Sequence, residues 1–446
     1  MSTQRRAVRR PWVIATLALI ALVIAAVVAI VAHRPDIALP PTLAQRQPDA
    51  ARGAYVAVLG DCAFCHTKGG GQPFAGGLKL STPIGAVYSS NITPDPETGI
   101  GNYSLEDFVR VMRFGVRPDG ARLYPAMPYT AYARATDQDL QDLLAYLQSR
   151  VAPVHEASRT TDIPWPLNLR WPLALWNAEF HDPSRFKTDT SKDDQWNRGA
   201  YLVEGLAHCG TCHTPRGLFF EEKDVRGVTN LYLSGTKLDG GSPINLRGNE
   251  GDGLGRWSAG AIASLLQSGR NEQSAVTGSM ADVVRHSTQY MTEHDVAAIA
   301  AYLKSLSPAP GERARFAAND TTTRTVMAGT ERSPGGRIYM DTCAACHRLS
   351  GGGESLTFPT LAGNSTVLNS DPSSLVAVIL NGARIPATDA TPTGLAMPGF
   401  GWRYDDIDIA ALATFIRTSW GNDATPVSAR QVSQLRHELS LSRADR

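Results

Sequence analysis

The pentapeptide Cys-x-x-Cys-His occurs three times in the chain and accounts for all six cysteines. This spacing is typical of a c-type haem attachment site, in which two thiols bond to the haem vinyl groups and the adjacent histidine becomes the proximal ligand of the iron. Chance predicts only about 0.002 copies for this composition. Three covalently bound haem c groups are therefore predicted. The attachment residues are Cys62, Cys65, Cys209, Cys212, Cys343 and Cys346, and the proximal ligands are His66, His213 and His347.

Other uses of paired cysteines fit the pattern less well. A disulfide or a thioredoxin-like redox pair does not require a following histidine, yet the histidine follows every pair here. A structural zinc site needs four ligands, and each pentapeptide supplies only three. The pattern therefore favours haem.

Composition limits the class of protein. Hydrophobic residues make up 43% of the 446 residues, which is enough to form packed cores. The length predicts roughly three domains. The net charge of +1 gives no basic excess, so nucleic acid is not an expected partner.

Residues 12–32 form an uncharged, strongly apolar run, preceded by Arg5, Arg6, Arg9 and Arg10. A helix of this length spans about 31 Å, the thickness of a hydrocarbon core. The positive-inside rule places the N-terminus in the cytoplasm and the chain after Arg34 outside. A retained membrane anchor is favoured over a cleaved signal peptide, whose apolar region is shorter. In either case the body of the protein is exported.

The signals around the three motifs recur in one order, which predicts three repeated domains. A short helical segment with a glycine and a tyrosine precedes each motif, a Gly/Pro-rich stretch follows it, and a helix with apolar residues at three- and four-residue spacing ends each unit. The closing helices begin at Thr136-Asp137, Thr292-Glu293 and Asp405-Asp406. The predicted divisions are 1–35 (basic tip and anchor), 48–152, 192–308 and 333–423 (cytochrome domains), 153–191 and 309–332 (linkers), and 424–446 (tail).

Each iron needs a sixth ligand, and methionine is the usual partner of histidine in electron-transfer cytochromes. Met127 and Met397 each lie between a motif and a closing helix and precede a proline. The second repeat offers Met280 and Met291. Met280 is favoured because its distance from the closing helix resembles that of the other two, whereas Met291 directly adjoins the helix start.

Two further segments have a distinctive pattern. Residues 153–196 hold four of the eight tryptophans among several prolines, which indicates either a packed strap between domains or an aromatic surface that docks a partner or faces lipid. In the C-terminal tail, Val432, Leu435 and Leu439 recur at helical spacing, which predicts a helix that packs back onto the body.

Several longer motifs resemble the triple-haem cytochrome c subunit of membrane-bound bacterial dehydrogenases over residues 48–423. They are Ser90-Asn-Ile-Thr-Pro-Asp95, Tyr124-Pro-Ala-Met-Pro-Tyr129, Arg198-Gly-Ala-Tyr-Leu-Val-Glu204, His208-Cys-Gly-Thr-Cys-His-Thr-Pro215, Gly255-Arg-Trp-Ser258 and Ser287-Thr-Gln-Tyr290. The third repeat is similar to class I cytochromes c, in which a proline such as Pro359 accepts a hydrogen bond from the proximal histidine. The implied fold is all-α, with three tandem class I cytochrome c domains after an N-terminal transmembrane helix.

The resemblance implies an electron-transfer role at the periplasmic face of a bacterial inner membrane. A catalytic subunit carrying flavin, pyrroloquinoline quinone or molybdopterin would oxidise an alcohol, sugar, sugar acid or aldehyde. Electrons would then pass through the three His/Met-ligated haems to membrane ubiquinone. The family also allows a small third subunit. No substrate-oxidising site is expected in this chain.

Two alternatives stay open at this point. The cytochrome could serve a molybdenum hydroxylase or donate electrons to a terminal oxidase. The second alternative is a multihaem peroxidase or reductase. Such an enzyme would require one haem without a sixth ligand. If Met280 did not bind iron, the second haem would be that site.

Overall fold

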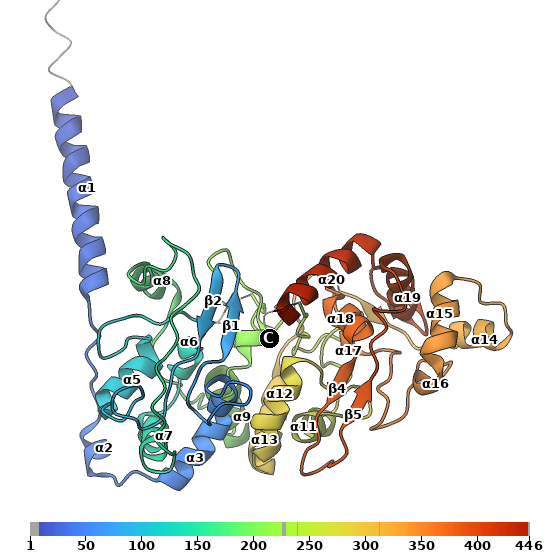
Figure 1. The fold of residues 1–446 in the computed structure, drawn as a ribbon, viewed down its shortest axis with the longest axis horizontal. Helices are drawn as coiled ribbons and strands as arrows, with labels where there is room; N and C mark the ends of the chain where they lie inside the picture. The colour runs from blue at the N-terminus through green and yellow to red at the C-terminus, as the bar shows by residue number, and fades with distance from the viewer. Residues whose placement is uncertain (1–8, 225–228, 239, 312, 445–446) are drawn as a thin grey trace, which may run out of the picture. The chain divides into compact units, whose positions relative to one another are not determined.

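The computed structural model describes residues 9–224, 229–238, 240–311 and 313–444, and helices predominate in it (Figure 1). The chain forms two compact units, Met1–Gly53 with His66–Arg185, and Ala54–Cys65 with Phe186–Arg446. The first includes α1 (Arg9–Ala32), α2 (Pro41–Gln45), α5 (Leu105–Phe114), α6 (Tyr129–Tyr132), α7 (Asp137–Ser149) and α8 (Pro172–Phe180). Helix α3 (Ala50–Leu59) begins in the first unit and ends in the second.

The second unit holds the remaining helices. They are α4 (Cys62–Cys65), α9 (Asp194–Tyr201), α10 (Gly210–His213), α11 (Ala259–Ser268), α12 (Ser279–His286), α13 (Glu293–Ser305), α14 (Thr321–Met327), α15 (Pro334–Thr342), α16 (Ala344–His347), α17 (Ser365–Leu368), α18 (Ser373–Asn381), α19 (Asp406–Thr418) and α20 (Ala429–Ala444). A π-helical turn, Leu202–Leu206, continues α9, and a 3-10 turn, Thr288–Tyr290, follows α12.

Helix α1 agrees with the predicted apolar span. Its stretch Trp12–Ala32 has a mean hydropathy of 3.1 and is, within the described residues, the one helix long and apolar enough to cross a membrane. Its side chains are largely exposed, and the helix projects from the body of the first unit (Figure 1). Of the basic residues that precede the span, Arg5 and Arg6 lie outside the described residues.

One helix crossing is repeated three times. The helix before each motif carries a glycine whose missing Cβ would collide with a carbonyl oxygen of the closing helix. The distances from the ideal Cβ position are 1.9 Å for Gly53 to Asp142 O, 2.0 Å for Gly199 to Ala298 O and 2.1 Å for Gly335 to Ala411 O. Four residues after each carbonyl, the Cβ of Tyr146, Tyr302 or Phe415 lies 2.8 Å from the same position. Only glycine permits this backbone approach.

The closing helices begin where the sequence predicts. The side-chain oxygens of Thr136 and Thr292 accept hydrogen bonds from the third backbone N–H of α7 and α13. Asp405 accepts from two backbone N–H groups of α19. These caps satisfy donors that the helix leaves unpaired, and the acidic first turns suit the helix dipole. The predicted starts of all three helices are confirmed.

Arginine–carboxylate pairs reinforce two of the crossings. In the second repeat, Arg198 donates two hydrogen bonds of 2.7 Å to the buried Asp295, and the Tyr55 hydroxyl donates a third. In the first repeat, Arg46 and Arg52 both donate to the fully buried Asp142. Because both carboxylates lose water but gain cationic donors, the pKa of each falls below its usual range despite burial.

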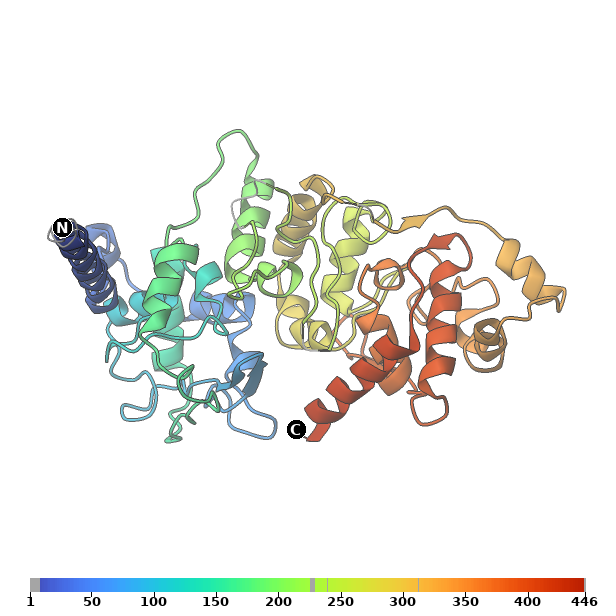
Figure 2. The same ribbon diagram turned by 90° about the horizontal axis from the view of Figure 1, so that it is seen from above.

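The C-terminal tail forms α20, which packs on α18 and α19 (Figure 2). Val432 is fully buried and Leu435 nearly so, and Leu439 packs against the same apolar cluster. The same cluster contains Tyr339, Phe415 and Trp420, whose rings lie 5.0–5.6 Å apart. The predicted packing of the tail is therefore confirmed.

The structure also contains short antiparallel strand pairs, which the all-α prediction omitted. They are β1 (Lys79–Thr82) with β2 (Gly85–Tyr88), β3 (Arg315–Phe316) with β6 (Asn422–Asp423), and β4 (Ala383–Ile385) with β5 (Leu395–Met397). Each strand is two to four residues long. Segments so short carry too little alternation to be recognised from sequence. The fold remains helical in its core.

We predict that Gly199→Ala lowers the free energy of unfolding by about 2 kcal/mol or more, because the added methyl forces α9 away from α13. The measurement is thermal unfolding followed by circular dichroism. Gly260→Ala is the matched control, since Gly260 is also helical but its Cβ position has nothing closer than 3.8 Å. This control should gain about 0.5 kcal/mol from lower backbone entropy in the unfolded chain. Equal melting temperatures for the two variants would contradict the prediction.

Candidate haem sites

Each Cys-x-x-Cys-His motif forms one helical turn, and the three turns are α4, α10 and α16. Because residues three apart lie on the same face of a helix, the two thiols of a motif point the same way. The helices α3, α9 and α15, which carry the crossing glycines, lead into these turns. The glycine crossing thus fixes where each motif begins.

The three motif histidines make the same hydrogen bond. The Nδ1 atoms of His66, His213 and His347 lie 2.7, 2.8 and 3.0 Å from the carbonyl oxygens of Ser90, Ile244 and Pro359. A carbonyl only accepts, so the proton sits on Nδ1 and the lone pair of Nε2 is left for a metal. Metal-binding histidines usually donate the N–H of their other ring nitrogen to a carbonyl or carboxylate in this way.

The Pro359 contact confirms the prediction made for the third repeat. The Ser90 and Ile244 contacts were not predicted, because a backbone carbonyl leaves no residue-type signal. Burial lowers the pKa of each of the three histidines, and the hydrogen bond to the carbonyl opposes that effect. The neutral imidazole, which is the ligand form, is therefore favoured.

The cysteines suit thioether formation. None of the six, all of which lie in the described part of the chain, forms a disulfide. Burial raises the pKa of the Cys62, Cys65, Cys209 and Cys343 thiols to about 12, so they are neutral S–H groups. Paired thiols followed by a correctly protonated imidazole are the donor set that haem c requires. The residues present therefore fit the cofactor.

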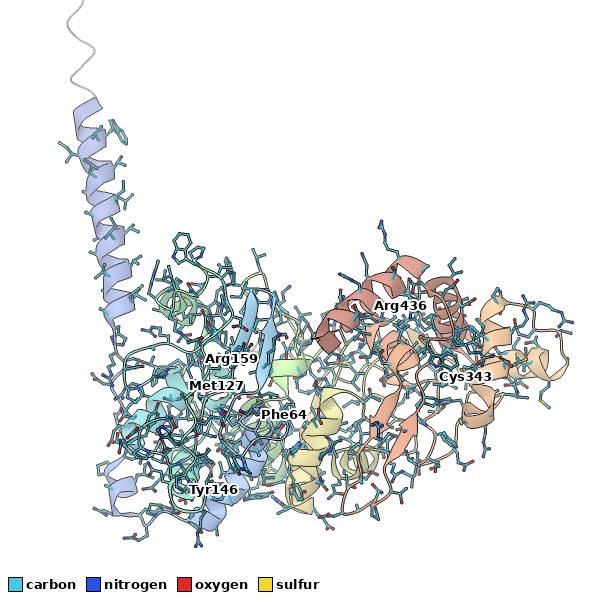
Figure 3. All side chains as sticks on the ribbon, viewed as in Figure 1. Phe64, Met127, Tyr146, Arg159, Cys343 and Arg436 are labelled. Atoms are coloured by element: carbon cyan, nitrogen blue, oxygen red, sulfur yellow. The ribbon has the colours of Figure 1, made fainter. Side chains whose placement is uncertain are left out.

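The structure places the three methionines on different kinds of element. Met127 lies in a turn just before α6 (Figure 3). Met280 lies in the first turn of α12, and Met397 at the end of β5. All three are partly buried. The competing Met291 is buried in the core at 5% exposure. Coordination of iron by these thioethers stays a prediction.

The cysteine turn of the first motif, Cys62–Cys65, belongs to the second unit, as does the second motif. Helix α12, which begins beside Met280, packs against α4. The ring of Phe64, inside the first motif, stacks on His286 with centroids 6.0 Å apart (Figure 3). Burial and, to a lesser extent, Asp61 and Cys212 raise the pKa of the Cys65 thiol. Haems attached to these turns would be neighbours.

Asp61 is a buried carboxyl group that sequence reasoning missed. It directly precedes Cys62, is 4% exposed and has a positive φ of 49°. Its Oδ1 atom has no hydrogen-bond partner among the described residues. Burial, with a smaller contribution from Asp282, raises the pKa of Asp61 to about 8. No motif marks this residue, so only the packing reveals it.

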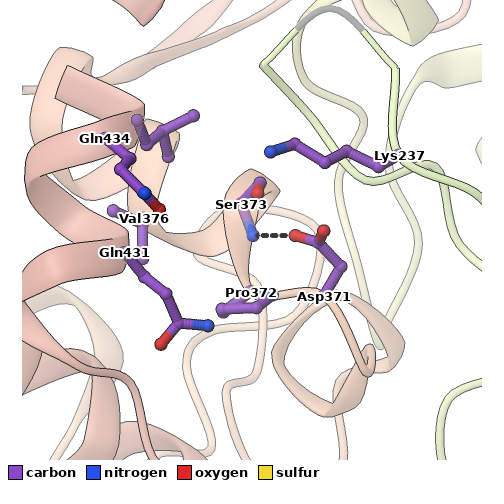
Figure 4. A pocket seen from close by; sticks show the side chains of 8 residues that line it. Lys237, Asp371, Pro372, Ser373, Val376, Gln431 and Gln434 are labelled. Carbon is purple, nitrogen blue, oxygen red and sulfur yellow. Dashed lines mark hydrogen bonds between the residues drawn. The ribbon is translucent and has the colours of Figure 1, made fainter. Parts of the chain in front are cut away.

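A small pocket of about 80 Å³ also occurs in the second unit (Figure 4). It lies between α18, α20 and the loop of Lys237, and among its lining residues Ser373 N donates to Asp371. Its lining includes no cysteine, histidine or methionine. The pocket is therefore separate from the candidate haem sites.

The helical fold and the repeated histidine geometry define a c-type cytochrome. The Cytochrome c family model matches residues 50–150 and 333–420. The gluconate 2-dehydrogenase cytochrome c subunit of Pantoea cypripedii is 45% identical, covering 87% of this chain and 90% of the relative. The alcohol dehydrogenase (quinone) cytochrome c subunit of Gluconacetobacter polyoxogenes is 46% identical, covering 86% and 83%. One of the subunits of the nicotinate dehydrogenase of Pseudomonas putida is 40% identical, covering 83% of this chain but 30% of the relative.

The chain belongs to the family of cytochrome c subunits of membrane-bound, quinone-dependent dehydrogenases, which includes alcohol, gluconate and fructose dehydrogenases. It is an electron-transfer subunit that binds haem c. The family resemblance stated from the sequence motifs is thereby confirmed, and so is the electron-transfer role.

We predict that the double variant Cys209→Ala/Cys212→Ala loses one covalent haem and retains the other two, because each motif binds its haem locally. The pyridine haemochrome assay and intact mass give the stoichiometry. The control is Ser149→Ala, a surface substitution on α7. An unchanged haem content in the double variant would contradict the assignment of the second site.

Proposed function

We propose that the chain carries three His/Met-ligated haems that pass electrons from a periplasmic dehydrogenase subunit to ubiquinone in the membrane. The observation that carries this proposal is the Nδ1–carbonyl hydrogen bond found in all three motifs. A histidine held in this way presents Nε2 in a fixed direction. Because the three motif histidines make the same hydrogen bond, their geometry supports three haems of the same kind.

The protein residues have simple roles in this scheme. The cysteines hold the macrocycle, and the histidines occupy one axial position of each iron. Met127, Met280 and Met397 would occupy the other positions, which raises the potential and leaves no site for a small substrate. When bound, haem supplies one-electron chemistry. A chain built in this way transfers electrons without binding the substrate itself.

We propose three cytochrome domains at 48–152, 192–308 and 333–423. The family match to 50–150 and 333–420 supports the first and third. The second domain has the same features as the other two. They are the Gly199 crossing, the Thr292 cap and the His213 hydrogen bond. These shared features support a cytochrome domain in the second repeat as well.

The partners follow from the family and the N-terminal helix. A catalytic subunit with flavin, pyrroloquinoline quinone or molybdopterin would deliver electrons, with a small third subunit as a further component. Helix α1 would remain as an anchor in the bacterial inner membrane, with the body at the periplasmic face. Its apolar length of 21 residues supports a complete span.

A molybdenum hydroxylase is a second candidate for the catalytic partner. The similarity over most of this chain to one component of a nicotinate dehydrogenase favours it. The partner can be identified by extracting the complex from its native membrane in mild detergent and analysing the co-purifying large subunit and its cofactor. A flavin, quinone or molybdopterin dehydrogenase would support the proposal. Isolation with oxidase subunits instead would overturn it.

We predict that Met280→His lowers the midpoint potential of one haem and slows ubiquinone reduction, because an imidazole stabilises ferric iron more than a thioether does. The measurement is a spectroelectrochemical redox titration. Met291→Leu is the control, since Met291 is a buried core residue and its replacement should leave all three potentials unchanged. The opposite pattern would assign the ligand to Met291.

Carbon monoxide binding separates this proposal from a peroxidase or reductase. Ferrous protein with three saturated haems should bind no carbon monoxide, whereas Met280→Ala should open one site. Binding by the unmodified protein would show a vacant haem and would overturn the relay of three saturated sites.

A further inference from the structure

An exposed apolar segment in the first unit is left unexplained by the haem sites. Within it, Trp165, Leu167, Leu169 and Trp171 are 77%, 51%, 41% and 49% exposed. Arg170 is the single charged residue between positions 163 and 178. Scattered apolar residues are normal on a surface, but a contiguous apolar patch marks an interaction site.

The segment is firmly held by the body of the unit. Ile163, at its start, is 4% exposed and Ala174, on α8, is 2% exposed. The Tyr124 hydroxyl donates to Leu167 O at 3.1 Å. The Arg170 guanidinium lies 4.7 Å from the centre of the Tyr124 ring and donates to Arg122 O. The Arg170 guanidinium is therefore paired with groups of the same unit. The apolar side chains point outward from a backbone that these contacts hold in place.

The same contacts connect the segment to the root of α1. The side chain of Arg122 donates to His33 O at 3.0 Å, directly after the apolar helix ends. Nearby, Arg110 donates to Pro35 O at 3.2 Å and Arg34 lies 3.9 Å from Asp107. Helix α8, which continues the segment, contacts α1 itself (Figure 1). The apolar segment therefore lies next to the C-terminal end of α1, where that helix would leave the membrane.

We propose that residues 163–178 form an interfacial membrane contact, in which Trp165 and Trp171 enter the headgroup region beside the exit of α1. This inference rests on the proposed function in that it takes α1 as a retained anchor. Tryptophan is enriched at this depth because its ring is apolar and its N–H is polar. Continuity with α1 favours lipid over a protein partner as the occupant.

The contact would fix the first haem domain against the bilayer. Met127 lies three residues after Tyr124, whose hydroxyl holds the patch, so the loop of the proposed sixth ligand shares its support (Figure 3). A single anchor helix leaves a body free to rotate about the helix axis, whereas a second contact beside it removes that freedom. The orientation of the first haem domain toward the membrane would then be set.

The test uses the full-length holoprotein with a unique new thiol, because haem attachment consumes the six native cysteines. Trp165→Cys is labelled with a nitrobenzoxadiazole maleimide, and the protein is reconstituted into phosphatidylethanolamine–phosphatidylglycerol liposomes. Lipids carrying a nitroxide near the headgroup should quench the probe about twofold. Trp165 is highly exposed, so the substitution should leave folding and haem content unchanged.

Ser149→Cys is the matched control, since this exposed residue ends α7 in the same unit. Its probe should keep its emission when nitroxide lipids are included. Flotation of the liposomes reports separately on the anchor.

Protein that floats with the vesicles while both probes stay unquenched overturns the interfacial contact and leaves the anchor intact. Protein that does not float overturns the anchor together with this inference. A probe at position 165 that is shielded only after the catalytic subunit is added would assign the patch to that subunit and overturn the choice of lipid.

Discussion

The contact between a glycine and the backbone of the closing helix is the constraint on which each repeat depends. A carbonyl oxygen about 2 Å from the ideal Cβ position of Gly53, Gly199 or Gly335 excludes every other residue. Because the motif turn follows the glycine helix within a few residues, the crossing also fixes the turn against the closing helix. A side chain at this position would shift the helix and the cysteines together.

The haem sites then depend on backbone geometry more than on side-chain chemistry. The three orienting acceptors are the carbonyls of Ser90, Ile244 and Pro359, which have no residue type in common. What they share is a loop that returns to the motif histidine. A carbonyl in such a loop costs little to desolvate once it accepts a hydrogen bond, and it selects the imidazole tautomer that a metal needs.

The sequence predicted the features that depend on local patterns. These include the motif turns, the capped starts at Thr136, Thr292 and Asp405, and the packing of Val432 and Leu435. It did not predict the short strands, whose length carries no periodicity. It also missed Asp61, because the burial of a lone carboxyl group depends on tertiary packing and leaves no local pattern in the sequence. The sixth ligands remain predictions, because ligation depends on where loops close around the cofactor.

Contacts within the second unit link the second repeat to the first motif and to the third repeat. Helix α12 of the second repeat contacts α4, the first motif. On its other side, the second repeat reaches the third through Arg270, which donates to Leu356 O and Thr393 O at 3.2 and 3.0 Å. Leu356 lies three residues before Pro359, and Thr393 lies four residues before Met397. The second haem would therefore stand between the other two.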